Sequence, residues 1–437
     1  MSEPLQAARS VRLDSLAEID PEALRESTSP RHRFKYVDIS CASNGRLALP
    51  SDFIEFSDAP SRARKMLRNG DLVVSTVRPN LKAFAYCRLA EGPYIASTGF
   101  AVLRAKENVD AYFLLSALLS DDLSKQIESH AVGSNYPAIN SSDIRRLQVP
   151  AFDSNTQRAI GKILGTIDTA IEQTEALIEK YQHIKAGLMH DLFTRGVLPT
   201  GQLRPPREHA PELYQETTMG WIPREWPVAA ARSLCSLITK GTTPAAHEMW
   251  QDGDGVRFLR VDNLTFDGQL TYEASSFRIA EKTHLGNLAR SRCLPGDVLT
   301  NIVGPPLGKV GLVTAQTGEL NINQAIAVFR PIEALSSVFL LRWLTTETVK
   351  RWFLQRAKQT SGQLNLTLAM CQDLPIPLVG RAEQSLILER SQSCEKLIQS
   401  EIDKLRLLKT QKLGLMQDLL TGKVSVTPVA AQEIATP

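Results

Sequence analysis

Several features of secreted, membrane and metal-binding proteins are missing from this sequence. Its six cysteines are widely spaced and form no CxxC pair, which argues against a disulfide framework and against zinc. No uninterrupted apolar run reaches roughly 18 residues, so no membrane-spanning helix is expected. The first residues lack the basic and then apolar pattern of a secretory signal. We therefore expect a reduced, cytoplasmic protein without a structural metal.

Charge is also nearly balanced. The net charge of +3 is too small by itself to indicate a nucleic-acid partner. Basic residues nevertheless gather at residues 62–68, and again at Arg290 and Arg292. Such clusters are typical either of contact with a polyanion or of a solvated helix face.

The chain contains one unit twice. Residues 187–194, Gly-Leu-Met-His-Asp-Leu-Phe-Thr, recur as residues 414–421, Gly-Leu-Met-Gln-Asp-Leu-Leu-Thr. At the same spacing, to within one residue, residues 70–73 correspond to residues 296–299. A spacing that stays constant over so much sequence indicates an internal repeat. The repeat predicts a pseudo-twofold molecule with two equivalent working surfaces.

Each copy ends in a long helical stretch. From Ser154, apolar residues recur at alternating steps of four and three, the period of a coiled coil. Polar residues at 153–157 favour a helix start, and Gly196 followed by Pro199 favours a stop. We expect the two helices to pack against each other antiparallel, with a homodimeric coiled coil as the alternative. The residues expected at helix packing or partner docking are Ile160, Leu164, Ile167, Ile171, Ile178, Leu188, Leu192, Ile398, Leu405, Leu408, Leu415 and Leu419.

The rest of the sequence mixes short β-type runs with helices, one of them near residues 111–127. We therefore predict duplicated α/β (α+β) globular domains joined by two long helices that form an antiparallel coiled coil. The expected parts are a first globular domain at 1–152, a central helix at 153–197, a linker at 198–219, a second globular domain at 220–379, a distal helix at 380–423 and a tail at 424–437.

This order of domain, helix, domain and helix resembles the specificity subunit of type I restriction-modification systems. The resemblance spans almost the whole chain and is carried by both helix endings, residues 185–194 and 412–422. Two further motifs contribute, Gly-Trp-Ile-Pro-Arg-Glu-Trp at 220–226 and Leu-Ile-Thr-Lys-Gly-Thr-Thr-Pro at 237–244. The first half lacks the Trp-Ile-Pro opening and the Lys-Gly-Thr-Thr-Pro turn.

The resemblance implies that the globular parts are target-recognition domains, each reading one half of a bipartite site on double-stranded DNA. It implies that the helices act as spacer and as docking surface for methyltransferase (modification) subunits, through which restriction and translocase subunits join. Because the two globular halves differ in sequence, the implied target is asymmetric. The implied role is defence against foreign DNA.

Catalysis by this chain is not expected. The Asp-Pro-Pro-Tyr type of loop that holds a flipped base is absent, and the nearest string, residues 303–307, lacks both the acid or amide and the aromatic residue. Residues 304–310 resemble a phosphate-binding loop, but one residue is missing between the glycines and Val310 replaces the hydroxyl residue. The seven histidines lack metal-ligand spacing. S-adenosylmethionine, ATP and magnesium are therefore expected in partner subunits, and no cofactor or metal in this chain.

The candidate DNA contacts are turns in which small residues bring the backbone close to phosphate while neighbouring polar side chains reach base edges. Any one of them is equally consistent with an ordinary surface turn. They are Arg78, Asn80, Lys82, Gly133, Ser134, Asn135, Tyr136, Lys240, Gly241, Thr242, Thr243, Lys309, Ser361, Gly362 and Gln363.

Two other functions stay open at this point. The chain could be a self-contained methyltransferase or nuclease with a degenerate motif, which methylation or cleavage of DNA by the purified chain would reveal. It could also be a scaffold whose duplicated domains bind proteins, which a DNA-binding assay with assembled partners would test. The recognised bases do not follow from the sequence, because base readout depends on side-chain placement and DNA shape.

Overall fold

The computed structural model describes residues 9–133, 137–251, 253–272, 277–360 and 362–426. The chain divides into two compact units. Unit 1 comprises Met1–Leu177 and Glu401–Pro437, and unit 2 comprises Ile178–Ser400. Each unit therefore contains one globular body and one stretch of each long helix. No helix in the described ranges is both long and apolar enough to cross a bilayer.

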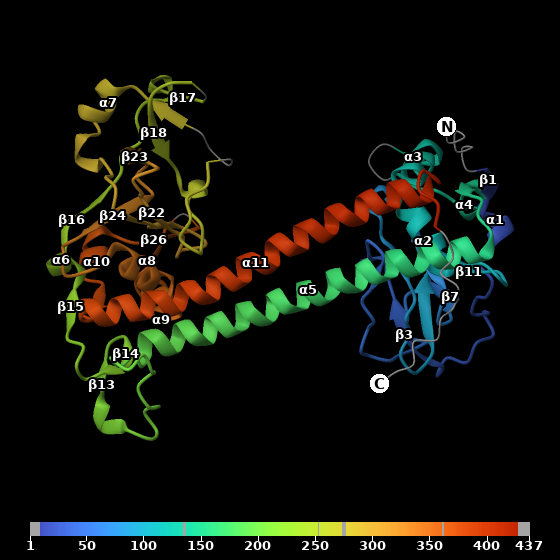
Figure 1. The fold of residues 1–437 in the computed structure, drawn as a ribbon, viewed down its shortest axis with the longest axis horizontal. Helices are drawn as coiled ribbons and strands as arrows, with labels where there is room; N and C mark the ends of the chain where they lie inside the picture. The colour runs from blue at the N-terminus through green and yellow to red at the C-terminus, as the bar shows by residue number, and fades with distance from the viewer. Residues whose placement is uncertain (1–8, 134–136, 252, 273–276, 361, 427–437) are drawn as a thin grey trace. The chain divides into compact units, whose positions relative to one another are not determined.

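Two four-stranded sheets form the body of unit 1 (Figure 1). The first is antiparallel, with the order β2 (Ala17–Ile19), β11 (Phe100–Ala105), β8 (Leu72–Ser75) and β9 (Phe84–Tyr86). The second has the order β6 (Ile54–Glu55), β3 (Arg33–Val37), β10 (Tyr94–Ser97) and β7 (Ala63–Leu67), with β3 and β10 parallel.

Strand β8 explains why this part of the sequence is continuously apolar. Leu72 and Val74 belong to the core cluster shared with α2 (Ala111–Leu119) and α3 (Asp121–His130). Val73, between them, belongs to a different core cluster. Successive strand residues point to opposite faces, so a strand covered on both faces is apolar at every position.

Unit 2 repeats this plan. Its antiparallel sheet has the order β16 (Cys235–Lys240), β24 (Ile326–Pro331), β20 (Val298–Asn301) and β22 (Val310–Leu312). Its second sheet has the order β17 (Met249–Gln251), β19 (Phe277–Ile279), β18 (Val256–Leu259) and β23 (Leu320–Ile322), with β18 and β23 parallel. Helices α8 (Ser337–Thr345) and α9 (Glu347–Arg356) occupy the sequence positions of α2 and α3.

Shorter elements complete the repeat. In unit 1, β1 (Ser10–Arg12) pairs with β12 (Gln148–Pro150), and α1 (Leu13–Leu16) and α4 (Ser141–Arg146) accompany them. In unit 2, β15 (Val228–Ala230) pairs with β27 (Pro375–Pro377), with α6 (Ala231–Leu234) and α10 (Leu368–Gln372). The described part of unit 2 also has the hairpin β13 (Tyr214–Thr217) and β14 (Gly220–Pro223), the short helix α7 (Glu281–Leu285) and a sheet of β21 (Val303–Gly304), β26 (Gln363–Asn365) and β25 (Lys358–Thr360).

The repeat extends to buried polar side chains. Arg104 donates to both carboxylate oxygens of Asp71 at 2.8 Å, and Arg330 donates to those of Asp297 at 2.8 and 2.7 Å. The two glutamines, Gln157 and Gln384, lie at corresponding places near the starts of the long helices. Each glutamine side chain accepts a hydrogen bond from the backbone N–H of the residue just before a shorter helix. Gln157 accepts from Asp110, before α2, at 3.2 Å, and Gln384 accepts from Ser336, before α8, at 2.9 Å. The match in hydrogen bonding supports a true internal duplication.

The long helices are α5 (Ser154–Thr194) and α11 (Arg381–Leu420), slightly shorter than the expected ranges (Figure 1). Asp153 caps α5 by accepting from the backbone N–H of Asn155 and Thr156 at 2.9 and 3.1 Å. After α5, Gly196 takes a left-handed backbone with φ of 65°, which favours glycine and ends the helix.

The two helices run antiparallel within each unit. In unit 1, Asp168 pairs with Lys412 at 2.6 Å and Glu175 with Lys409 at 2.9 Å. In unit 2, Lys185 pairs with Glu395 at 2.8 Å, and further along α5 the Met189 sulfur accepts from Ser391 at 3.4 Å. The residue numbers of the paired side chains rise along α5 as they fall along α11. The expected antiparallel packing within one chain is therefore confirmed.

Three local expectations differ from the structure. The single helix expected near 111–127 is two helices, because Ser120 leaves the helical conformation and its hydroxyl caps α3. The segment expected as a linker, 198–219, contains β13 and the buried Arg204. The basic cluster at 62–68 lies largely on strand β7, so a solvated helix face is wrong there.

Candidate nucleic-acid interface

The candidate turns of unit 2 gather at one end of the sheet β16-β24-β20-β22. At this end β16 and β20 finish while β24 and β22 begin, so the connecting turns meet. The backbone N–H of Gly241 donates to the carbonyl of Ile326 at 3.1 Å, and that of Ile302 donates to Ala325 at 2.8 Å. We call this end of the sheet the candidate edge of unit 2. The structure thus brings the turn at Lys240–Thr243 and the turn that leads to Lys309 to the same edge.

An arginine that was not among the candidate residues lies beside the first of these turns. The Arg290 side chain is exposed and donates to the hydroxyl of Thr242 at 3.0 Å. Thr243 in turn contacts Gln324, from the turn before β24, and Lys240 is exposed at the end of β16. The only sequence signal for Arg290 was its place in a local basic cluster.

A buried asparagine organises the second turn. The Asn301 side chain is fully buried; its oxygen accepts from the backbone N–H of Gly308 and Lys309 at 3.0 and 2.9 Å. Its amide nitrogen donates to the carbonyl of Pro306 at 2.9 Å. These hydrogen bonds from one buried side chain to the backbone fix the conformation of residues 303–309.

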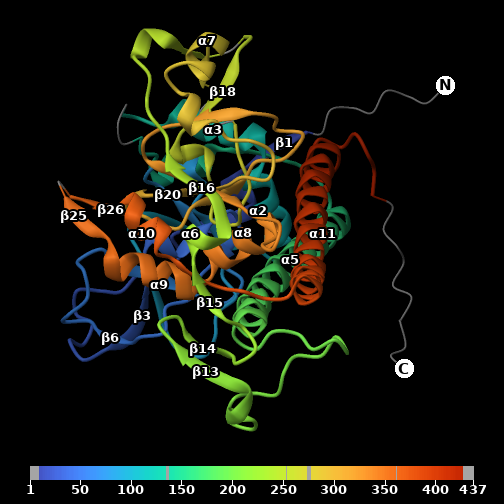
Figure 2. The same cartoon turned by 90° about the vertical axis from the view of Figure 1, so that its left-hand side faces the viewer.

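The pairing of β21 with β26 places the hairpin β25–β26 next to this turn (Figure 2). Gly362 and Gln363, two candidate residues, are exposed on the hairpin, and Gly362 has a φ of 78°. Ser361, a third candidate, lies outside the described residues. The segments around Lys309 and Gln363, distant in sequence, are therefore neighbours in unit 2.

Unit 1 shows the corresponding arrangement. The turn η2 (Pro79–Leu81) lies between Arg78 and Lys82, which both have left-handed backbones with φ of 48° and 50°. The N–H of Arg78 donates to the carbonyl of Pro137 at 2.7 Å, and Val77 bridges to Ala138. The Arg78 turn and the segment after Gly133 are therefore adjacent.

The remaining candidates of unit 1 differ in their surroundings. Asn80 and Gly133 are exposed. The Lys82 ammonium instead donates to the carbonyl of Leu119 at 3.0 Å and lies 3.7 Å from Asp121, so it neutralises the carboxyl end of α2. Ser134, Asn135 and Tyr136 lie outside the described residues.

The two units differ in electrostatics near these turns. In unit 1, the β7 residue Lys65 pairs with Asp20 at 2.7 Å, and Arg68 pairs with Glu22. In unit 2, Arg290 hydrogen-bonds a neutral hydroxyl, so its charge is not cancelled by that partner. Its neighbour Arg292 does pair with Glu319, and this hydrogen bond holds the pKa of the Glu319 carboxyl below its usual range, against the effect of burial. Arg290 is therefore a more available cation than Arg292.

No group of three or more described His, Cys, Asp or Glu residues is placed to hold a metal ion. All six cysteines are free, and burial raises the pKa of the Cys371 thiol to about 12. A thiol with such a pKa stays protonated at neutral pH and is a poor nucleophile.

The helix positions expected at packing surfaces fall into two groups. Ile160, Leu164, Ile167, Ile171, Ile178, Leu192, Ile398 and Leu419 are buried, whereas Leu188, Leu405, Leu408 and Leu415 are half-buried. The repeated motif at the helix endings also inserts residues into the globular cores. Phe193 packs against Phe339 and Trp343 in unit 2, with ring centroids 5.2 and 5.8 Å apart, while Met416 and Leu420 join the core of unit 1. This explains why the motif recurs in both copies.

Residues 11–181 match the family model described as "Type I restriction modification DNA specificity domain". The chain is 25% identical over 339 residues to the MjaVIII specificity subunit of Methanocaldococcus jannaschii, covering 76% of this chain and 75% of that protein. It is 20% identical over 419 residues to the HindI specificity subunit of Haemophilus influenzae, covering 84% of this chain and 89% of that protein. A chain from a structure of complex assembly in a type I restriction-modification system shares the fold, with a TM-score of 0.62, 21% identity and coverage of 97% and 100%.

Residues 11–181 therefore resemble a type I restriction-modification DNA specificity domain, and the chain shares the duplicated α/β fold of the solved structure. The resemblance to type I restriction-modification specificity subunits that was stated from the sequence is confirmed.

Proposed function

We propose that each unit reads one part of a bipartite, asymmetric target on double-stranded DNA through the turns at its candidate edge. The observation that carries this proposal is the gathering of separate candidate turns at one end of a sheet in each unit. A set of turns held on a rigid sheet presents several side chains to one ligand, as a recognition surface requires.

The chemistry of the unit 2 edge suits DNA. Lys240 and Arg290 supply exposed cations that attract phosphate, and Arg290 has the forked geometry that also fits guanine in the major groove. Gln324 and Gln363 are exposed amides that can pair with base edges. Phosphate contacts position the protein, and base contacts give the specificity.

We further propose that this chain is not catalytic by itself and that its helices dock methyltransferase subunits. In this view S-adenosylmethionine, ATP and magnesium belong to partner subunits. The sequence supports the view, because it holds no Asp-Pro-Pro-Tyr type of loop and its nearest phosphate-loop string, residues 304–310, is incomplete. Methylation or cleavage of DNA by the purified chain would contradict it.

The first test measures the target directly. Single-molecule sequencing would compare methylated DNA from cells that carry the chain with its neighbouring methyltransferase and from cells that lack only the chain. We expect a methylated motif of two short blocks that disappears with the chain. A methylation pattern that does not change would favour the scaffold function instead.

The second test addresses unit 2. Arg290→Ala should weaken binding of the identified target by about 1–3 kcal/mol, since one cationic or bidentate contact is lost. A phosphate contact would lower affinity on all sequences and reduce the salt dependence, whereas a base contact would relax specificity within one block only. Arg381→Ala serves as the control, because Arg381 is exposed in the same unit and makes no ion pair with a described residue. Equal affinities for the wild type and Arg290→Ala would contradict the assignment of this edge.

A further inference from the structure

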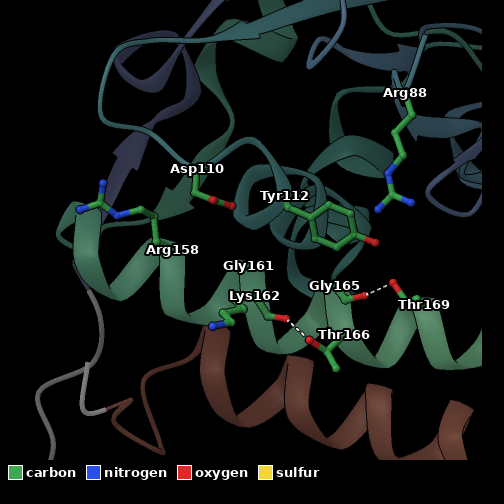
Figure 3. Close-up of a pocket in the computed structure, with 9 residues that line it drawn as sticks. All are labelled: Arg88, Asp110, Tyr112, Arg158, Gly161, Lys162, Gly165, Thr166 and Thr169. Atoms are coloured by element: carbon green, nitrogen blue, oxygen red, sulfur yellow. Dashed lines mark hydrogen bonds between the residues drawn. The ribbon is translucent and has the colours of Figure 1, made fainter. Parts of the chain in front are cut away.

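A polar cleft of about 460 Å³ opens in unit 1 between α5, the start of α2 and the segment after β9 (Figure 3). Arg158 and Lys162 line it from the first turns of α5, and Arg88 lines it from the segment after β9; in Figure 3 Arg158 and Arg88 lie on opposite sides of Asp110 and Tyr112. Gly161 and Tyr112 also line it, and a side chain at residue 161 would collide with Asp110.

Basic side chains outnumber acidic ones in the lining of this cleft, which holds Arg88, Arg158 and Lys162 but only the carboxylate of Asp110. Arg88, Arg158 and Lys162 are all exposed, and none forms an ion pair with a described residue. The nearby carboxylates are already engaged. Asp110 caps α2 by accepting from the N–H of Phe113 at 2.8 Å, and Asp168 accepts from Tyr112 at 2.8 Å while pairing with Lys412 at 2.6 Å. Three cations therefore face solvent in one concave site.

The corresponding place in unit 2 has a different character. The internal repeat matches Arg158 with Ser385, Lys162 with Glu389 and Arg88 with Thr314. A cleft of about 430 Å³ in unit 2 includes Thr314 and Val338, but no residue of α11 lines it.

The two arginines at the unit 2 cleft are already bonded. Arg257 donates to the carbonyl of Thr317 at 2.9 Å, and Arg342 pairs with Glu395 at 2.6 Å. The unit 1 cleft therefore has no full counterpart among the described residues of unit 2. Within the described part of the chain, its three cations have only uncharged partners: Arg158 donates to the Asn155 side chain, and Arg88 lies over the Tyr86 ring.

The position of the unit 1 cleft separates it from the candidate DNA contacts. The Arg78–Lys82 turn connects the end of β8 to the start of β9. Arg88 instead follows the end of β9, and Asp110 follows the end of β11. Because these strands are antiparallel, the cleft and the turn lie at opposite ends of the same sheet. A DNA duplex held at the turn would leave the cleft free.

We propose that the unit 1 cleft is a docking site for an acidic segment of a partner subunit, whose carboxylates pair with Arg88, Arg158 and Lys162. The inference deepens the proposed docking of methyltransferase subunits and rests on it. It also assigns a difference between two otherwise duplicated surfaces, since the unit 2 counterpart carries Glu389 where unit 1 carries Lys162. The two units would therefore present different contacts to identical partner subunits.

The test replaces the two helix cations by their unit 2 counterparts, as Arg158→Ser with Lys162→Glu in the full chain. Both side chains are exposed on the helix surface, so folding should be preserved, as melting temperature and circular dichroism would verify. The control double variant is Arg146→Ser with Lys423→Glu, which changes net charge equally at exposed sites of the same unit. Binding of each chain to the purified methyltransferase subunit is measured at low and at high salt, and binding to target DNA is measured separately.

We expect the cleft variant to bind the methyltransferase subunit at least tenfold more weakly at low salt, with a smaller difference at high salt and unchanged DNA affinity. The control variant should bind like the wild type. Equal subunit binding by the cleft variant and the wild type would overturn the inference while leaving the proposed function intact. Weakened DNA binding with normal subunit binding would also overturn it, since the cleft would then be a DNA contact. If the wild-type chain itself fails to bind the subunit, the proposed docking fails and this inference fails with it.

Discussion

Asn301 shows how one buried side chain can shape a recognition turn. Its amide makes hydrogen bonds at both ends to the backbone of residues 303–309, and none of its surface reaches solvent. Buried polar groups are stabilising only while their partners remain, because an unsatisfied donor or acceptor has lost its hydration. The backbone groups that Asn301 satisfies would be left without that partner after truncation.

Asn301→Ala should therefore lower the free energy of unfolding by about 1–3 kcal/mol, because several backbone groups lose a hydrogen-bond partner. Chemical denaturation would measure the change, with Asn287→Ala as an exposed asparagine control in the same unit. We also expect weaker binding of the target block read by unit 2. Unchanged stability would mean that water replaces the asparagine in this turn.

At the scale of elements, two equivalent ion pairs align the long helices. Lys185 with Glu395 in unit 2 corresponds by the repeat to Lys412 with Asp168 in unit 1. In both pairs the lysine comes from the repeated motif near the helix ending. The side chains are about one-fifth to one-quarter exposed, so the attraction is less screened than at the surface.

A double-mutant cycle on Lys185→Ala and Glu395→Ala should give a coupling energy of about 1 kcal/mol or more, because this pair is partly buried. The exposed pair between Arg406 and Asp403 is the internal comparison, and its coupling should be roughly 0.3 kcal/mol. Thermal or denaturant unfolding of the four variants in each cycle supplies the values. A coupling for Lys185 and Glu395 no larger than the comparison would show that apolar packing alone sets the helix register.

At the scale of the whole molecule, the proposed bipartite readout depends on the length of α5 and α11. Each residue adds about 1.5 Å to a helix, so a heptad adds about 10 Å, close to three base pairs of duplex. The antiparallel pairing lets matched insertions face each other, since Glu175 lies against Lys409.

Inserting one heptad after Thr174 and one after Leu405 should lengthen the unread spacer while both half-sites stay the same. Sequencing of methylated DNA from cells with the altered chain would show this directly. A single heptad in α5 alone is the control, and it should disrupt the helix pairing and abolish methylation. Altered half-sites in the doubly extended chain would contradict the separation of reading turns from helices.

Much of the architecture followed from local patterns. The helix period near 3.5 residues and the polar caps predicted α5 and α11 to within a few residues at each end, because a helix forms from contacts close in sequence. The internal repeat matches Asp71 with Asp297 and Gln157 with Gln384. The hydrogen bonds of these buried side chains recur in both units. The break at Ser120 was missed, since α2 and α3 are separated by only that residue and apolar residues continue across it to Leu123 and Ile127.

The sequence by itself therefore determined the duplication, the long helices, the family resemblance and the kind of turn to examine, because all of these depend on residue order and local period. Only the tertiary structure decided which turns share an edge. Strand pairing brings distant segments together, so that Arg290 donates to Thr242 and Asn301 accepts from the backbone N–H of Lys309. Likewise the cations at Arg88 and Lys162 form one cleft only because α5 packs beneath α2. Such placements arise from burial of the shared core, to which residues contribute without regard to their separation in the chain.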